Sequence, residues 1–163
     1  MNIFFLDSDI EKCAQYHVDK HVVKQRLELA QLACTAHHVL GDIDSSKIPY
    51  KPTHKNHPCA IWVRESLFNY MYVVNLGLEL CKEMRHRFNI PHQKIEEVLL
   101  WLKENPIQVN DCFMSKPKLA VGEKIIENDE YWNYAVDNYR NYYNETKQHL
   151  FKWSKRETPY WIK

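Results

Sequence analysis

Apolar side chains recur every three to four residues through most of the chain, the spacing of helices that bury one face. Ser8 and Glu11 form a capping-box pair before the first such run, and Gly41 is placed to end it. Proline and Asn-Pro steps bound the later runs. The helices predicted in this way cover residues 9–40, 58–88, 92–104 and 128–153.

The rest of the chain reads as irregular structure, at about 41–57 and 106–127 and in a tail over 154–163. Only three glycines occur in 163 residues, and strand-rich folds need many glycine-containing turns. The sequence therefore predicts an all-α fold in one domain over residues 1–163. Its long first helix packs across two or three others.

Charge and composition narrow the function classes. The net charge of +1 excludes a strongly basic nucleic-acid binder at the level of the whole chain. A local patch remains, because residues 147–163 carry five Lys and Arg residues against Glu157 alone, a net +4. Aromatic residues reach 13%, enough to build a core or to stack on bases.

The five cysteines are widely spaced with no CxxC pair, which indicates reduced thiols. No signal peptide is expected, since the apolar start meets Asp7, and no apolar run is long enough to span a membrane. We expect a cytoplasmic protein. The sequence does not indicate its oligomeric state.

Residues 17–35 place a line of polar side chains along the first helix, within about 80° on a helical wheel. Its members are His17, His21, Lys24, Glu28, Gln31 and Thr35. Apolar residues flank the line on both sides, with Val18 and Val22 on one side and Val23 and Leu27 on the other. A second polar face, with Asp19, Arg26 and His37, lies opposite.

If both apolar flanks are packed, one polar face is exposed to solvent and the other lines a groove, where pKa values shift and chemistry becomes feasible. The alternative is that the line is an ordinary solvated face, which the i,i+4 pair of Lys24 and Glu28 also suits.

The segment before Pro58 groups His54, Lys55, Asn56 and His57 at a predicted helix start. Free backbone amides at a helix N-terminus attract phosphate, and these side chains would reinforce the attraction. Trp62 and Arg64 follow one turn later. The alternative is a capped loop without a ligand.

These segments together resemble the phage endonuclease V family, the pyrimidine-dimer DNA glycosylases. His21 precedes Glu28-Leu29 by seven residues, as a His precedes the catalytic Glu-Leu of that family. Three further segments look similar, namely Asn56-His57-Pro58, Arg87-Phe88-Asn89-Ile90 and Thr158-Pro159-Tyr160-Trp161.

The resemblance implies an all-helical fold and a phage or bacterial origin. It implies a Glu that acts at the sugar of a damaged or modified nucleotide in duplex DNA, and a nucleophilic N-terminal amine. The chain departs from the family at two positions. Asn2 is too bulky for efficient removal of Met1, and Leu27 stands where the family has an Arg before its Glu.

The resulting candidates fall into two groups, with no cofactor and no metal expected. The catalytic candidates are Glu28, His21, Lys24 and the amine of Met1. The candidates for DNA contact are His17, His54, Lys55, Asn56, His57, Trp62, Arg64, Lys152, Lys155, Arg156, Tyr160 and Trp161.

Two other functions are compatible with the same residues. One is a metal-dependent hydrolase that binds zinc through the histidines at 17, 21, 54 and 57 with Glu28. The other is a protein that binds DNA, RNA or a nucleotide without catalysis. Base release that survives a chelator would favour the glycosylase.

Overall fold

The computed structural model describes residues 1–122 and 130–163, and all regular structure in them is helical, which confirms the predicted fold class. The α-helices are α1 (Ile10–Tyr16), α2 (Asp19–Leu40), α3 (Pro58–Glu65), α4 (Leu67–Phe88), α5 (Lys94–Glu104) and α6 (Tyr131–Thr146). Two short 3₁₀ turns are η1 (Ser45–Lys47) and η2 (Gln148–Leu150).

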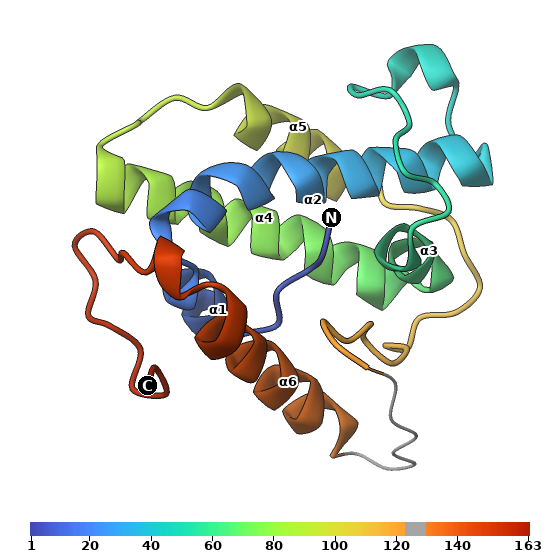
Figure 1. Ribbon diagram of the computed structural model, residues 1–163. Helices are drawn as coiled ribbons and strands as arrows, with labels where there is room; N and C mark the ends of the chain where they lie inside the picture. Colours follow the sequence, from blue (N-terminus) through green and yellow to red (C-terminus); the bar gives the residue numbers. More distant parts are fainter. Residues whose placement is uncertain (123–129) are drawn as a thin grey trace.

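Helices α2 and α4 lie side by side and run in opposite directions, and they form the largest helix–helix contact of the fold (Figure 1). Helices α3 and α5 each pack on both of them, and α1 packs on α4. Helix α6 lies across the lower side of this group in Figure 1.

The first predicted helix is two helices. Helix α1 ends at Tyr16, because His17 adopts an extended backbone with ψ of 134°. The Arg87 guanidinium of α4 donates hydrogen bonds to the carbonyl groups of Gln15 and His17. A continuous helix would need these carbonyls for its own hydrogen bonds, so the interaction with α4 stabilises the break.

The second predicted helix is also divided, at Ser66. The backbone there is extended, and the hydroxyl group of Ser66 accepts from the amide of Asn69 as the N-cap of α4. Serine favours this position because its short side chain satisfies a free amide of the first turn.

The last helix differs from its prediction at the C-terminal end, where α6 stops at Thr146 and the chain turns through η2. Its predicted start near Asn128 lies outside the described residues. No helix among the described residues is both long and apolar enough to span a membrane.

The N-terminal segment passes through the core. Ile3, Phe5 and Leu6 are fully buried. The ring of Phe5 contacts Trp62 of α3 and Tyr139 of α6, with centroids 5.5 Å apart in both cases. This packing fixes the course of the chain that leads back to Met1.

Candidate active site

The loop that carries His54 and His57 lies along α2. The ring of His38 hydrogen-bonds through Nε2 to the carbonyl oxygen of Tyr50 at 2.9 Å. One turn earlier on α2, the Thr35 hydroxyl accepts from the amide of Thr53 at 3.0 Å and donates to its carbonyl at 3.2 Å. The loop therefore runs antiparallel to α2, towards Glu28.

The loop ends at His57, which caps α3. Its Nδ1 accepts from the amide of Cys59 at 3.1 Å, so the neutral ring carries its proton on Nε2. Partial burial lowers the pKa of His57, the nearby α-amino group of Met1 and His54 lower it further, and Glu28 opposes them. His57 therefore lies within electrostatic reach of the amine and of the carboxylate.

The amine of Met1 acts on Cys59 as well. Burial raises the pKa of the Cys59 thiol, while the backbone of Ile3, the amine and Lys118 lower it. Three separate segments thus lie within electrostatic range of one another: the chain start, the first half of α2 and the N-terminus of α3. We refer to the Met1 amine, Glu28 and His57 as the amine–glutamate cluster.

Both carboxylate oxygens of Glu28 have partners. Lys24 Nζ lies 3.3 Å from Oε1, and Gln25 Nε2 donates to Oε2 at 2.8 Å. The Glu28 side chain is 14% exposed, whereas that of Lys24 is 71% exposed. Lys24 therefore lacks the desolvation that an amine nucleophile needs, and its position suits a cation beside the carboxylate.

The other catalytic candidate, His21, is buried between helices. Its Nδ1 is 2.5 Å from the hydroxyl of Tyr143 in α6, and its ring stacks on Phe4. Burial lowers its pKa to about 4, with smaller effects from Lys147 and Lys24. His21 is therefore neutral at pH 7 and joins α6 to α2.

Two of the side chains predicted to contact DNA, His17 and Trp62, are buried in the core. His17 is fully buried at the end of α1, with Nδ1 bonded to the carbonyl of Cys13 at 2.7 Å, and burial lowers its pKa to about 3. Trp62 is also fully buried, and its Nε1 donates to the carbonyl of Ser115 at 3.1 Å. Neither side chain can reach DNA without opening the core.

Arg64 stabilises the loop before α3 through a hydrogen bond. Its NH1 donates to the carbonyl of Lys55 at 2.7 Å, one turn before the start of α3. The side chains of His54, Lys55 and Asn56 are exposed. They remain available for phosphate beside the amine–glutamate cluster.

The predicted flanks of the polar line differ from expectation. Val23 and Leu27 are exposed, whereas Asp19, Arg26 and His37 of the opposite polar face are buried. These three are buried because other elements supply polar partners, as when Gln93 accepts from Arg26. A helical wheel does not contain those partners.

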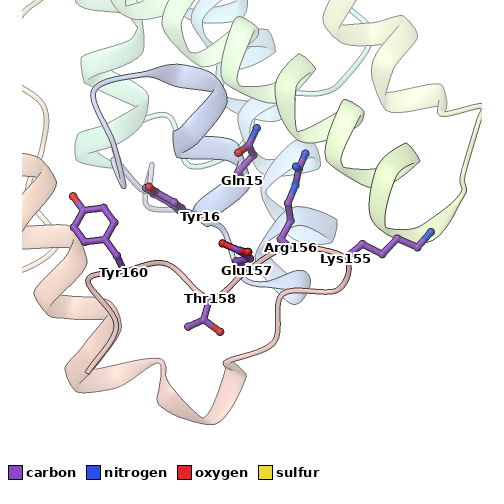
Figure 2. A pocket seen from close by; sticks show the side chains of 7 residues that line it. All are labelled: Gln15, Tyr16, Lys155, Arg156, Glu157, Thr158 and Tyr160. Carbon is purple, nitrogen blue, oxygen red and sulfur yellow. The ribbon is translucent and has the colours of Figure 1, made fainter.

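The tail candidates lie elsewhere. Lys155, Arg156 and Tyr160 line a pocket of about 430 Å³ with Gln15 and Tyr16 of α1, and Lys155 and Tyr160 stand on opposite sides of it (Figure 2). Tyr160 is 79% exposed. Lys152 is exposed and Trp161 half-buried.

The tail joins the first turn of α2, where the hydroxyl of Ser154 donates to Asp19 at 2.6 Å. Asp19 precedes Glu28 by nine residues, which is about 14 Å of helix. The predicted site residues are therefore divided between the amine–glutamate cluster and the tail.

The zinc site of the alternative hydrolase function finds no support in the geometry. Within residues 1–122 and 130–163, no group of three or more His, Cys, Asp or Glu side chains is placed to hold a metal ion. His17 is enclosed in the core, away from the loop that carries His54 and His57.

Two residues beside the site were missed. Thr35 was placed on the polar line but not as the anchor of the loop, which depends on a contact with Thr53 that no spacing predicts. Gln25 was not singled out, although its i,i+3 spacing from Glu28 is one at which helical side chains meet.

Comparison with known proteins identifies the family of this chain. The family model described as pyrimidine dimer DNA glycosylase matches residues 1–96, which include α1 to α4 and all three members of the amine–glutamate cluster. No curated protein and no solved structure shows a significant match. Because the matched segment is more than half of the chain, this protein belongs to the pyrimidine dimer DNA glycosylase family.

Proposed function

We propose that the protein removes a damaged or modified base from duplex DNA by cleaving the N-glycosidic bond, with Glu28 as the catalytic carboxylate. The observation that supports this most is that the Met1 amine and Glu28 both lie within electrostatic range of His57, and that all three residues fall inside the segment of the family match.

The chemistry requires a carboxylate of this kind. As the bond between C1′ and the base breaks, the base leaves with the electron pair and positive charge develops on the deoxyribose. A nearby Glu28 carboxylate stabilises that charge and takes a proton from the attacking water. Its small exposed fraction strengthens the electrostatic interaction.

The exposed cations near Glu28 and in the tail would contact the DNA backbone. Lys24, His54 and Lys55 are exposed on α2 and on the loop that leads to His57. The tail that carries Lys155 and Tyr160 contacts the first turn of α2 through Ser154, about 14 Å of helix before Glu28. Since successive phosphates of a strand advance by about 3.4 Å along the axis of the duplex, both regions can contact one duplex a few steps apart. Tyr160 then offers an aromatic face to a base near the lesion.

The test is base release from duplex DNA that contains a single thymine dimer, with and without chelator. We expect release that is indifferent to chelator and at least a hundredfold slower in Glu28→Gln. Release abolished by chelator would favour the metal hydrolase instead. Retention of DNA without release would leave only a binding protein, and full activity in Glu28→Gln would exclude that residue.

We further propose that strand cleavage is the weaker activity. Cleavage through a Schiff base needs a free amine at the sugar, and a retained Met1 puts a long side chain beside that amine. Borohydride should therefore trap little protein on abasic-site DNA. Abundant trapping, mapped by mass spectrometry to residue 1, 2 or 24, would establish a bifunctional enzyme.

A further inference from the structure

His57 ends the loop before α3 with a restricted backbone and a fixed ring. The proline that follows it favours an extended backbone, and His57 adopts φ of −65° and ψ of 137°. Its Nδ1 accepts from the amide of Cys59 at 3.1 Å, and its carbonyl accepts from the amide of Ile61 at 3.0 Å. The neutral ring is therefore held in one tautomer, with its proton on Nε2.

The Nε2–H group is the part of His57 that the fold leaves unused. Within residues 1–122 and 130–163, no group accepts a hydrogen bond from it, and the nitrogen is accessible to solvent. Partial burial, the amine of Met1 and His54 lower the pKa of the ring, so it is neutral at pH 7. His57 therefore presents a neutral donor of fixed direction to a ligand.

This donor lies beside the groups that would act on the sugar. The backbone of Ile3, two residues from the Met1 amine, hydrogen-bonds to the thiol of Cys59, the residue whose amide His57 caps. The loop that ends at His57 runs along α2, and the charge of Glu28 acts on the ring. Glu28 would stabilise the positive charge on the deoxyribose, which leaves the negative charge on the departing base without a partner.

We propose that His57 is a catalytic residue whose Nε2–H donates to the carbonyl oxygen O2 of a departing pyrimidine, an inference that rests on the proposed glycosylase function. As the C1′–N1 bond breaks, the base keeps the electron pair, and N1 shares the negative charge with O2. The hydrogen bond from Nε2 strengthens as this charge develops, so it stabilises the transition state more than the bound substrate. The imidazole keeps its proton, and the released base takes one from water. A purine has no carbonyl group next to the nitrogen that leaves, so this contact selects pyrimidines.

Two variants separate the donor from the cap. His57→Asn keeps a side-chain oxygen that can accept from the Cys59 amide, because asparagine is a preferred N-cap, and it lacks the distant donor. His57→Gln places an amide donor near the position of Nε2 and is not a preferred N-cap. In single-turnover base release from thymine-dimer duplex DNA, we expect the maximal rate to fall about a hundredfold in His57→Asn. His57→Gln should be about tenfold faster than His57→Asn.

A binding measurement separates contact with the base from contact with the backbone. Duplex DNA with a tetrahydrofuran residue at the lesion keeps every phosphate and lacks the base, so His57→Asn should bind it as tightly as the wild type does. The matched control is His92→Asn, which changes an exposed histidine between α4 and α5. It should keep the wild-type rate and affinity. Thermal unfolding of the same samples reports whether each variant is folded.

Three results would overturn the proposal. His57→Asn could release the base at the wild-type rate. His57→Gln could be no faster than His57→Asn, which would leave His57 as the cap of α3 alone. His57→Asn could also bind the tetrahydrofuran duplex more weakly by the factor that its rate falls, which would place the donor on the DNA backbone. In each case wild-type base release is intact, so only this role of His57 is excluded. A wild-type protein that releases no base removes the proposed function and this role together.

Discussion

Helix α2 contacts two charged clusters whose residue types are similar and whose environments differ. At its first turn, Asp19 belongs to what we call the Glu83 network, formed by Asp19, Glu83, Arg87 and Arg156. Arg87 donates to Glu83 at 2.8 Å and to Asp19 at 3.1 Å, and Arg156 donates to Glu83 at 2.6 Å. The amine–glutamate cluster, whose Glu28 lies nine residues further along α2, has one carboxylate, a histidine and an amine, with the exposed Lys24 beside the carboxylate.

The difference lies in how the charges are satisfied. Burial alone would raise the pKa of Glu83, but hydrogen bonds from Arg156 and Arg87 lower it overall. In the Glu83 network each carboxylate therefore meets an arginine within the protein. In the amine–glutamate cluster, Glu28 instead meets no arginine, and its partners are the exposed Lys24 and the amide of Gln25. Internal pairing separates a structural cluster from a candidate site better than residue type does.

The largest effect should come from breaking the pairing. In Glu83→Gln, two arginines lose their shared carboxylate, and we expect the free energy of unfolding to fall by about 3 kcal/mol or more in urea titrations. The matched change in the other cluster, Glu28→Gln, should alter stability by less than about 0.5 kcal/mol while it slows base release at least a hundredfold. Equal losses of stability would mean that both clusters are structural.

Acidification should act on the helix between the two clusters. The pKa of His21 is lowered from 6.5 to about 4, so the neutral ring stabilises the fold above pH 6.5, and this stability is lost as the pH falls towards 4. His21→Phe keeps the stack on Phe4 and cannot be protonated. Its stability should fall less between pH 6.5 and 4, by up to about 3 kcal/mol. Parallel pH profiles of wild type and variant would contradict the buried neutral state.

The sequence could predict the helical fold, because periodicity is a local signal. The residues of the amine–glutamate cluster were named partly through the family resemblance, and their proximity depends on three separate segments. Periodicity identified the helices, and Pro58 marked the start of α3. Periodicity could not predict the breaks at His17 and Ser66. The first depends on a guanidinium seventy residues away that takes the carbonyls of α1, and Ser66 interrupts an apolar pattern that continues on both sides of it.

The same limit explains the site residues that were placed wrongly. Arg156 reads as a tail cation in the sequence, yet it donates to Glu83, and His17 reads as part of a polar line, yet it is enclosed. Whether a polar side chain is paired within the protein or free to bind a ligand depends on partners from distant segments. His57 shows the reverse case, since its unpaired donor becomes apparent only once its cap on Cys59 is known.

The smallest effect should distinguish the two clusters by their contact with DNA. Lys55 is an exposed side chain beside the amine–glutamate cluster, and Lys155 is exposed beside the Glu83 network. If both contact phosphate, Lys55→Ala and Lys155→Ala should each weaken binding of any duplex and reduce the slope of log affinity against log salt by about 0.9. Fluorescence anisotropy between low and physiological salt measures both quantities.

Arg156→Ala should instead lower stability, because its guanidinium is paired with Glu83. A reduced salt slope in Lys55→Ala alone would confine the DNA interface to the amine–glutamate cluster, and a slope unchanged in both variants would make the two lysines ordinary solvated side chains.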